Sequence, residues 1–192
     1  MQRMTRKRRG NSAGFTLVEL LTVVVIVGIL ATIGIVLVSQ HFRESKSVEA
    51  RSIITAIRAA QEARRAETGS YLNVSRSGKW YPATPNGKQK RSFVTAHDDS
   101  AWWTQLSVSR TDGTMFGFKT WAGPPGPVPN NSSDFKTDGY GLSATEQTFT
   151  FPSSSDDWYI IEAAGDVDGD GVLSIFLATS FNGELYTERD GE

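Results

Sequence analysis

The chain has 192 residues, enough for one modest globular domain together with an additional segment. It contains no cysteine, which excludes disulfides and a cysteine nucleophile. Its formal charge of −1 is unevenly distributed: residues 1–14 hold five of the 20 basic residues and none of the 21 acidic ones, so the remainder has 15 basic residues and a charge of −6.

A long apolar run follows this basic segment. Residues 20–38 include no charged side chain, and as a helix rising about 1.5 Å per residue they approach the roughly 30 Å of a bilayer core. A helix is expected despite the β-branched residues, because every backbone polar group must be satisfied inside lipid. The basic residues are expected to stay in the cytoplasm, with the C-terminal body on the other side of the membrane. A secretory signal peptide fits less well, since its apolar region is shorter.

An acidic residue, Glu19, stands immediately before the apolar run. A carboxylate at the centre of a membrane helix costs about 2.5–3.5 kcal/mol, and less near an end, so such a group usually has a partner. A plain single-pass anchor does not explain this residue. The alternative is a glutamate without a functional role, whose side chain reaches the membrane interface.

The junction between the basic segment and the apolar run reads Gly14-Phe15-Thr16-Leu17-Val18-Glu19. It resembles the processing site of type IV prepilins and type II secretion pseudopilins. The resemblance implies a leader peptide over residues 1–14, removal of this leader by prepilin peptidase between Gly14 and Phe15, N-methylation of Phe15, and a role for Glu19 in assembly. Glu19 of a neighbouring subunit would neutralise the new amine, because a paired buried charge is tolerable where an isolated one is expensive.

The resemblance also implies partners and a location. The partners are the prepilin peptidase, an inner-membrane assembly platform, the lipid bilayer and other pilin or pseudopilin subunits in a helical polymer. The protein is expected to cross the inner membrane once, with its C-terminal domain in the periplasm, and then to enter a pilus or pseudopilus. Major pilins of this family often have a proline where this chain has Val36, and many family leaders are shorter. Both differences favour a minor pilin or a pseudopilin.

Beyond the membrane segment, residues 45–68 keep a helical spacing of apolar side chains. We therefore predict one long helix over residues 15–68, with an amphipathic second half that packs on a sheet. Gly69 is expected to cap its C-terminal end. The apolar positions of this second half are Val48, Ile53, Ile54, Ile57 and Ala60.

Residues 69–192 are expected to form one globular antiparallel β domain, which makes the fold α+β. Residues 73–101 and the proline-rich residues 123–131 are predicted to be loops, with a short helix or turn from Trp102. Lys79, Lys88, Lys90 and Arg91 are read as solvated, and DNA binding is not expected. Strands are predicted over residues 115–121, 149–151, 158–164, 173–180 and 183–187.

An acidic loop precedes the second-last of these strands. Asp166, Asp168 and Asp170, followed by Gly171, match the first half of an EF-hand-like calcium loop, to which the Val172 carbonyl and Ser174 would add ligands. The position of the usual bidentate glutamate is Leu177, so a further ligand would come from Glu162, Asp156, Asp157 or Glu184. Some secretion pseudopilins of the family use calcium to fix a C-terminal loop. An Asp/Gly-rich turn without an ion is the alternative.

Enzymatic function is not expected. The chain has two histidines, His41 beside the apolar run and His97 in a polar stretch, and neither Gly-x-Ser-x-Gly nor a phosphate-binding glycine loop. Three interpretations stay open: a subunit of a type IV pilus-like filament, with a minor pilin favoured; a pseudopilin of type II secretion; and a membrane-anchored surface binding protein that shares the export route.

Overall fold

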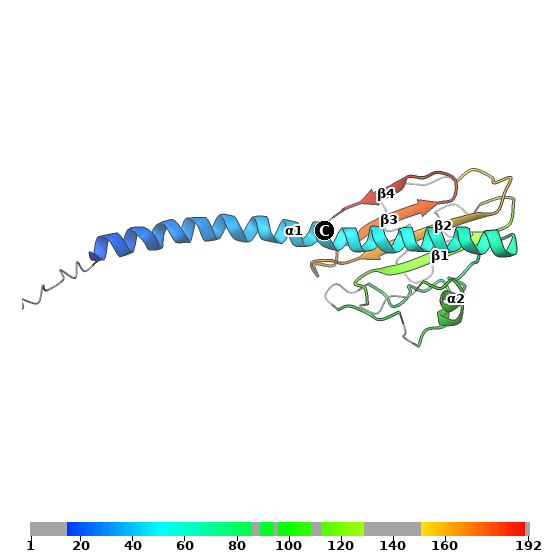
Figure 1. The fold of residues 1–192 in the computed structure, drawn as a ribbon, viewed down its shortest axis with the longest axis horizontal. Coiled ribbons are helices and arrows are strands. Elements are labelled where there is room, and N and C mark those ends of the chain that lie inside the picture. Colours follow the sequence, from blue (N-terminus) through cyan, green and yellow to red (C-terminus); the bar gives the residue numbers. More distant parts are fainter. Residues whose placement is uncertain (1–14, 86–88, 94–95, 109–112, 129–150, 191–192) are drawn as a thin grey trace, which may run out of the picture. The chain divides into compact units, whose positions relative to one another are not determined.

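The computed structural model describes residues 15–85, 89–93, 96–108, 113–128 and 151–190 (Figure 1). It contains the helices α1 (Leu17–Thr68) and α2 (Ser100–Gln105) and the strands β1 (Gly117–Gly123), β2 (Trp158–Gly165), β3 (Ser174–Thr179) and β4 (Leu185–Glu188). The chain divides into two compact units, residues 1–40 and residues 41–192. Helix α1 contributes residues to both units.

The first unit consists of the apolar part of α1. By length and composition, Leu17–Ile35 is able to cross a membrane, with a mean hydropathy of 2.6 and no buried residues. This span begins three residues before the predicted one at residue 20, and it therefore includes Glu19. Apolar side chains are exposed on every side of the helix, from Leu17 to Ile35. A helix that is apolar all round is stable only where lipid or other protein surrounds it.

In the second unit, α1 packs on the sheet through a stripe of buried side chains. Ala50, Ile53, Ile54 and Ile57 are at most 2% exposed and belong to one core cluster with residues of the strands β1, β2 and β3. Burial of each isoleucine side chain contributes about 1.5–3 kcal/mol to the free energy of unfolding. The predicted stripe was wrong at Val48, which is 62% exposed, whereas Ser47 beside it is 4% exposed. The packed face of this part of the helix therefore passes through Ser47 and Ala50.

The end of α1 is defined by two contacts that the sequence only partly foretells. Gly69 has a positive φ of 81° and its N–H donates to the Arg65 carbonyl at 2.8 Å, which confirms the predicted cap. Gln61 is fully buried and forms two hydrogen bonds with the backbone of Leu72, at 2.7 and 2.9 Å. These bonds attach the chain that leaves the helix to the helix itself.

The four strands form an antiparallel sheet in the order β1-β2-β3-β4 (Figure 1). Successive side chains of a strand point to opposite faces, and both faces are covered. On the face toward α1, Ile161 of β2 and Phe176 of β3 join the main core cluster. On the other face, Ile160 and Leu177 form a second cluster with Trp158. The expected α+β architecture is confirmed.

The strand boundaries differ from the predicted ones in places. Strand β2 begins at Trp158 as predicted, whereas β1 runs from Gly117 to Gly123 and so enters the segment predicted to be a proline-rich loop. A Cβ at Gly123 would lie 2.6 Å from the Trp158 ring, so the missing side chain lets the two strands stay paired at this end. Phe151 is not in a strand, and the rest of the strand predicted over 149–151 lies outside the described residues.

Candidate functional site

The N-terminal end of α1 is closed by a reciprocal pair of hydrogen bonds between Thr16 and Glu19. The Glu19 N–H donates to Oγ1 of Thr16 at 3.2 Å, and the Thr16 N–H donates to Oε2 of Glu19 at 2.9 Å. The Thr16 hydroxyl also donates to Oε2 at 2.7 Å. The Thr16 carbonyl accepts the N–H of Leu20, so Thr16 is the N-cap residue. This arrangement is a capping box, in which two backbone donors at the helix end are satisfied.

The capping box places Phe15 outside the helix. Phe15 is 88% exposed and not helical, and the first helical residue is Leu17. The expected helix over residues 15–68 thus begins two residues later than predicted, because Thr16 holds the N-cap position. Gly14 and the leader lie outside the described residues, so the processing position itself stays a prediction.

Sequence reasoning missed the pairing of Thr16 with Glu19, although a signal for it was present. A threonine followed three residues later by a glutamate, just before an apolar run, is the signature of a capping box. The two expectations for Glu19 were a partner on a neighbouring subunit and a side chain that reaches the membrane interface, and neither involved Thr16. The structure adds an intramolecular partner to these expectations.

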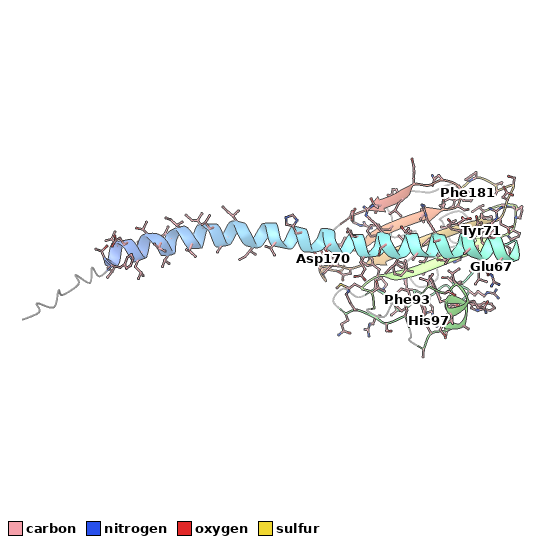
Figure 2. The ribbon with its side chains drawn as sticks, viewed as in Figure 1. Glu67, Tyr71, Phe93, His97, Asp170 and Phe181 are labelled. Atoms are coloured by element: carbon pink, nitrogen blue, oxygen red, sulfur yellow. The ribbon has the colours of Figure 1, made fainter. Side chains whose placement is uncertain are left out.

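The acidic loop joins β2 to β3. One carboxylate oxygen from each of Asp166, Asp168 and Asp170 lies within 4.8 Å of the others. Asp166 is 8% exposed and its two oxygens accept the N–H groups of Gly169 at 2.7 Å and Gly171 at 3.3 Å. Asp170 is exposed, and Figure 2 shows it at the opposite end of the second unit from Tyr71. The group could bind a hard cation such as calcium, which prefers oxygen ligands.

The other predicted ligands of this loop are only partly near the three aspartates. The Val172 N–H donates to Oδ1 of Asp170 at 2.7 Å, which keeps that residue in the same turn. Ser174 is buried as the first residue of β3, opposite Gly165 of β2. In the described part of the chain, none of the four acids proposed as a further ligand belongs to the group; they are Glu162, Asp156, Asp157 and Glu184.

Two of these four acids have other surroundings. Glu162 is 1% exposed in the middle of β2, opposite Lys119 of β1. Asp156 lies 3.7 Å from the guanidinium of Arg65, near the C-terminal end of α1. A cation at the loop would therefore complete its shell of six to eight oxygens with backbone carbonyls and water. Lys46 of α1 donates to the Val167 carbonyl at 2.7 Å and attaches this loop to the helix.

Comparison with known proteins identifies the N-terminal segment. The family model described as "Prokaryotic N-terminal methylation motif" matches residues 9–35. No curated protein and no solved structure matches the chain. The matched residues include the Gly14–Phe15 junction, the Thr16–Glu19 capping box and the apolar span. The chain therefore has the N-terminal methylation motif typical of type IV pilins and pseudopilins, on an α+β fold of the pilin-like kind.

Proposed function

We propose that this protein is a structural subunit of a type IV pilus-like filament, in the role of a minor pilin, processed after Gly14 and assembled through α1. The observation that supports this proposal is the exposed apolar helix from Leu17 to Ile35, which lies within the matched methylation motif and has Glu19 near its start. Pilin-like proteins are generally structural rather than enzymatic, and we extend that role to this chain.

The apolar helix explains how one segment serves two environments. In the inner membrane its side chains contact lipid, and in a filament they contact the same kind of apolar surface on neighbouring helices, so the exchange is nearly neutral in hydrophobic free energy. The direction of assembly and the axial register between neighbouring subunits then have to be determined by polar groups. Glu19 provides one, because its charge pairs with the amine that processing creates on Phe15 of the next subunit.

The minor-pilin role is favoured over a major pilin by Val36 in place of the family's frequent proline and by the long leader. A pseudopilin of type II secretion is the alternative within the same class. A membrane-anchored binding protein is the alternative from another class, and it predicts a processed chain that never enters a filament. The proposed partners are prepilin peptidase, an inner-membrane assembly platform and other pilin or pseudopilin subunits, with DNA not among them.

A pair of variants tests the proposed processing and assembly. Gly14→Leu should leave the full-length chain uncut, because it replaces the glycine that directly precedes the proposed cut within the matched motif. Glu19→Ala should be cut normally but should enter filaments at least tenfold less, since the buried amine then has no partner; this corresponds to about 1.4 kcal/mol or more. The chain mass and the sheared-filament fraction measure the two steps. A mature-sized Gly14→Leu product, or normal incorporation of Glu19→Ala, would refute the corresponding role.

We also propose that the β2–β3 loop binds calcium as a structural ion. The convergence of the Asp166, Asp168 and Asp170 carboxylates supports this proposal. Three like charges at this distance repel each other unless a cation screens them. Because the protein has no disulfide, such an ion would add to the hydrogen bonds that hold this turn.

A further inference from the structure

We infer that Thr16 is a positioning residue for assembly: it fixes one oxygen of the Glu19 carboxylate to its own helix and presents the other to the amine of an incoming subunit. The inference rests on the proposed function and adds a residue to it. It follows from which oxygen of Glu19 is engaged in the subunit.

Both hydrogen bonds that Glu19 accepts end on the same oxygen. Oε2 accepts the Thr16 N–H at 2.9 Å and the Thr16 hydroxyl at 2.7 Å. Within the described part of the chain, Oε1 accepts no hydrogen bond. A carboxylate has about four lone-pair sites, so one oxygen can cap the helix while the other accepts a charged donor. Glu19 therefore does not have to leave its helix in order to pair with a neighbour.

The capping box is also compatible with processing. Cleavage between Gly14 and Phe15 creates an amine on Phe15, and methylation would modify that same nitrogen. The N–H that Thr16 donates belongs to the next peptide bond and is altered by neither step. The carboxylate is thus held in one orientation before and after the leader is removed.

Holding the carboxylate in place has an energetic consequence. A free glutamate side chain has several rotamers to lose when it pairs, whereas one already fixed by two hydrogen bonds loses few. The Thr16 hydroxyl accepts the Glu19 N–H as well, so the same side chain orders both the helix end and the acid. Removing this hydroxyl should weaken pairing while the charge of Glu19 is retained.

The test uses full-length variants in the cells that produce the protein. Thr16→Val removes the hydroxyl while keeping nearly the same side-chain shape, and Thr16→Ser keeps the hydroxyl. Thr22→Val is the matched control, because the Thr22 hydroxyl donates to the Val18 carbonyl at 2.8 Å on the same apolar helix without contacting Glu19. The measurements are the mass of the processed chain and its amount in sheared filaments, with Glu19→Gln as a parallel variant that keeps the helix cap and loses the charge.

We expect Thr16→Val to be cut after Gly14 and to enter filaments roughly 3- to 30-fold less than the parent, the range that corresponds to loss of a helix cap. Thr16→Ser and Thr22→Val should match the parent. Normal incorporation of Thr16→Val, failure of Thr16→Ser to restore it, an uncut Thr16→Val chain, or an equal loss in Thr22→Val would each overturn the inference. If Glu19→Gln enters filaments normally, the proposed role of the Glu19 charge fails instead, and the inference fails with it.

Discussion

At the scale of single residues, the structure assigns several polar groups to partners that their sequence positions do not reveal. Thr16 and Glu19 form hydrogen bonds with each other at the N-terminal end of α1, and Gln61 forms hydrogen bonds with the backbone of Leu72 near the C-terminal end of the helix. Tyr159 is a buried residue whose side chain can ionise. Its ring lies edge-on to Tyr71, with centroids 4.8 Å apart, and it is 4% exposed.

The ionisation of Tyr159 predicts a loss of stability at high pH. Burial, together with the nearby negative charge of Glu62, raises the pKa of Tyr159 to about 12. Between pH 10 and 12 the unfolded chain ionises this tyrosine first and binds fewer protons than the folded one, so the free energy of unfolding falls as pH rises, by up to about 1.4 kcal/mol per pH unit. The contribution is fully present below pH 10.

Thermal unfolding of the detergent-solubilised protein from pH 8 to 11.5 tests this expectation. Tyr159→Phe should show a shallower decline above pH 10 than the parent and a parallel profile below it. Equal slopes for the two proteins above pH 10 would show that Tyr159 does not titrate with a raised pKa.

At the scale of elements, α1 is one helix with two different apolar surfaces. Its first part is apolar on every side, whereas its second part has a single buried stripe that contacts the sheet. Because of this stripe, we expect truncation of two similar residues on the same helix to change the free energy of unfolding by very different amounts. Ile57 is fully buried and Val48 is 62% exposed.

Ile57→Ala should lower the free energy of unfolding by about 2–5 kcal/mol, because it removes buried methyl groups and leaves a cavity. Val48→Ala is the matched control and should change it by no more than about 0.5 kcal/mol. Chemical denaturation of the full-length protein in detergent measures both values. Similar losses for the two variants would contradict the packing described for α1.

The β2–β3 loop makes a second prediction at this scale. If the loop binds calcium, the ion should raise the unfolding temperature, with a stabilisation of about 2.7 kcal/mol at one hundred times the dissociation constant. Asp168→Asn and Asp170→Asn should abolish this effect, since each removes a charged ligand without disturbing the hydrogen bonds of Asp166. Asp98→Asn is the control, because Asp98 is paired with Lys79 outside the loop.

A calcium-dependent shift that survives in both loop variants would place the ion elsewhere. The absence of any shift in the parent would favour the Asp/Gly turn without an ion. Differential scanning fluorimetry with calcium and with a chelator distinguishes these results.

The second half of the long helix was predictable from the helical spacing of its apolar residues, and the last three strands were predictable as short runs separated by turn residues. Trp158 marks the predicted start of β2, and Gly69 marks the end of the helix. The extension of β1 to Gly123 was not predictable, because it depends on the Trp158 ring of another strand. Periodicity also could not foresee that Lys119 and Glu162 lie buried opposite each other in the sheet, since burial of charges depends on tertiary contacts.

The candidate site was predictable in its composition but not in its geometry. The motif around Phe15 and Glu19 follows from the sequence and is matched by the methylation family model. The use of a single Glu19 oxygen for the helix cap needs coordinates. The three aspartates converge as their spacing predicted, whereas Ser174 is buried in β3.

At the scale of the whole molecule, the two compact units contain different features of the chain. The unit of residues 1–40 contains the basic segment, the matched motif and the membrane span. The unit of residues 41–192 contains the sheet, both core faces and the acidic loop. In the proposed function, the first unit determines where the protein goes and how it joins its neighbours, and the second is the part presented on the filament surface.

The most direct test of this account is the mass of the native chain in sheared surface filaments. The account predicts a chain that begins at a methylated Phe15 and is present at low abundance beside a more abundant subunit. The same processed chain confined to the inner membrane would contradict the pilus assignment in favour of a secretion pseudopilin. A chain that retains residues 1–14 would contradict the account as a whole.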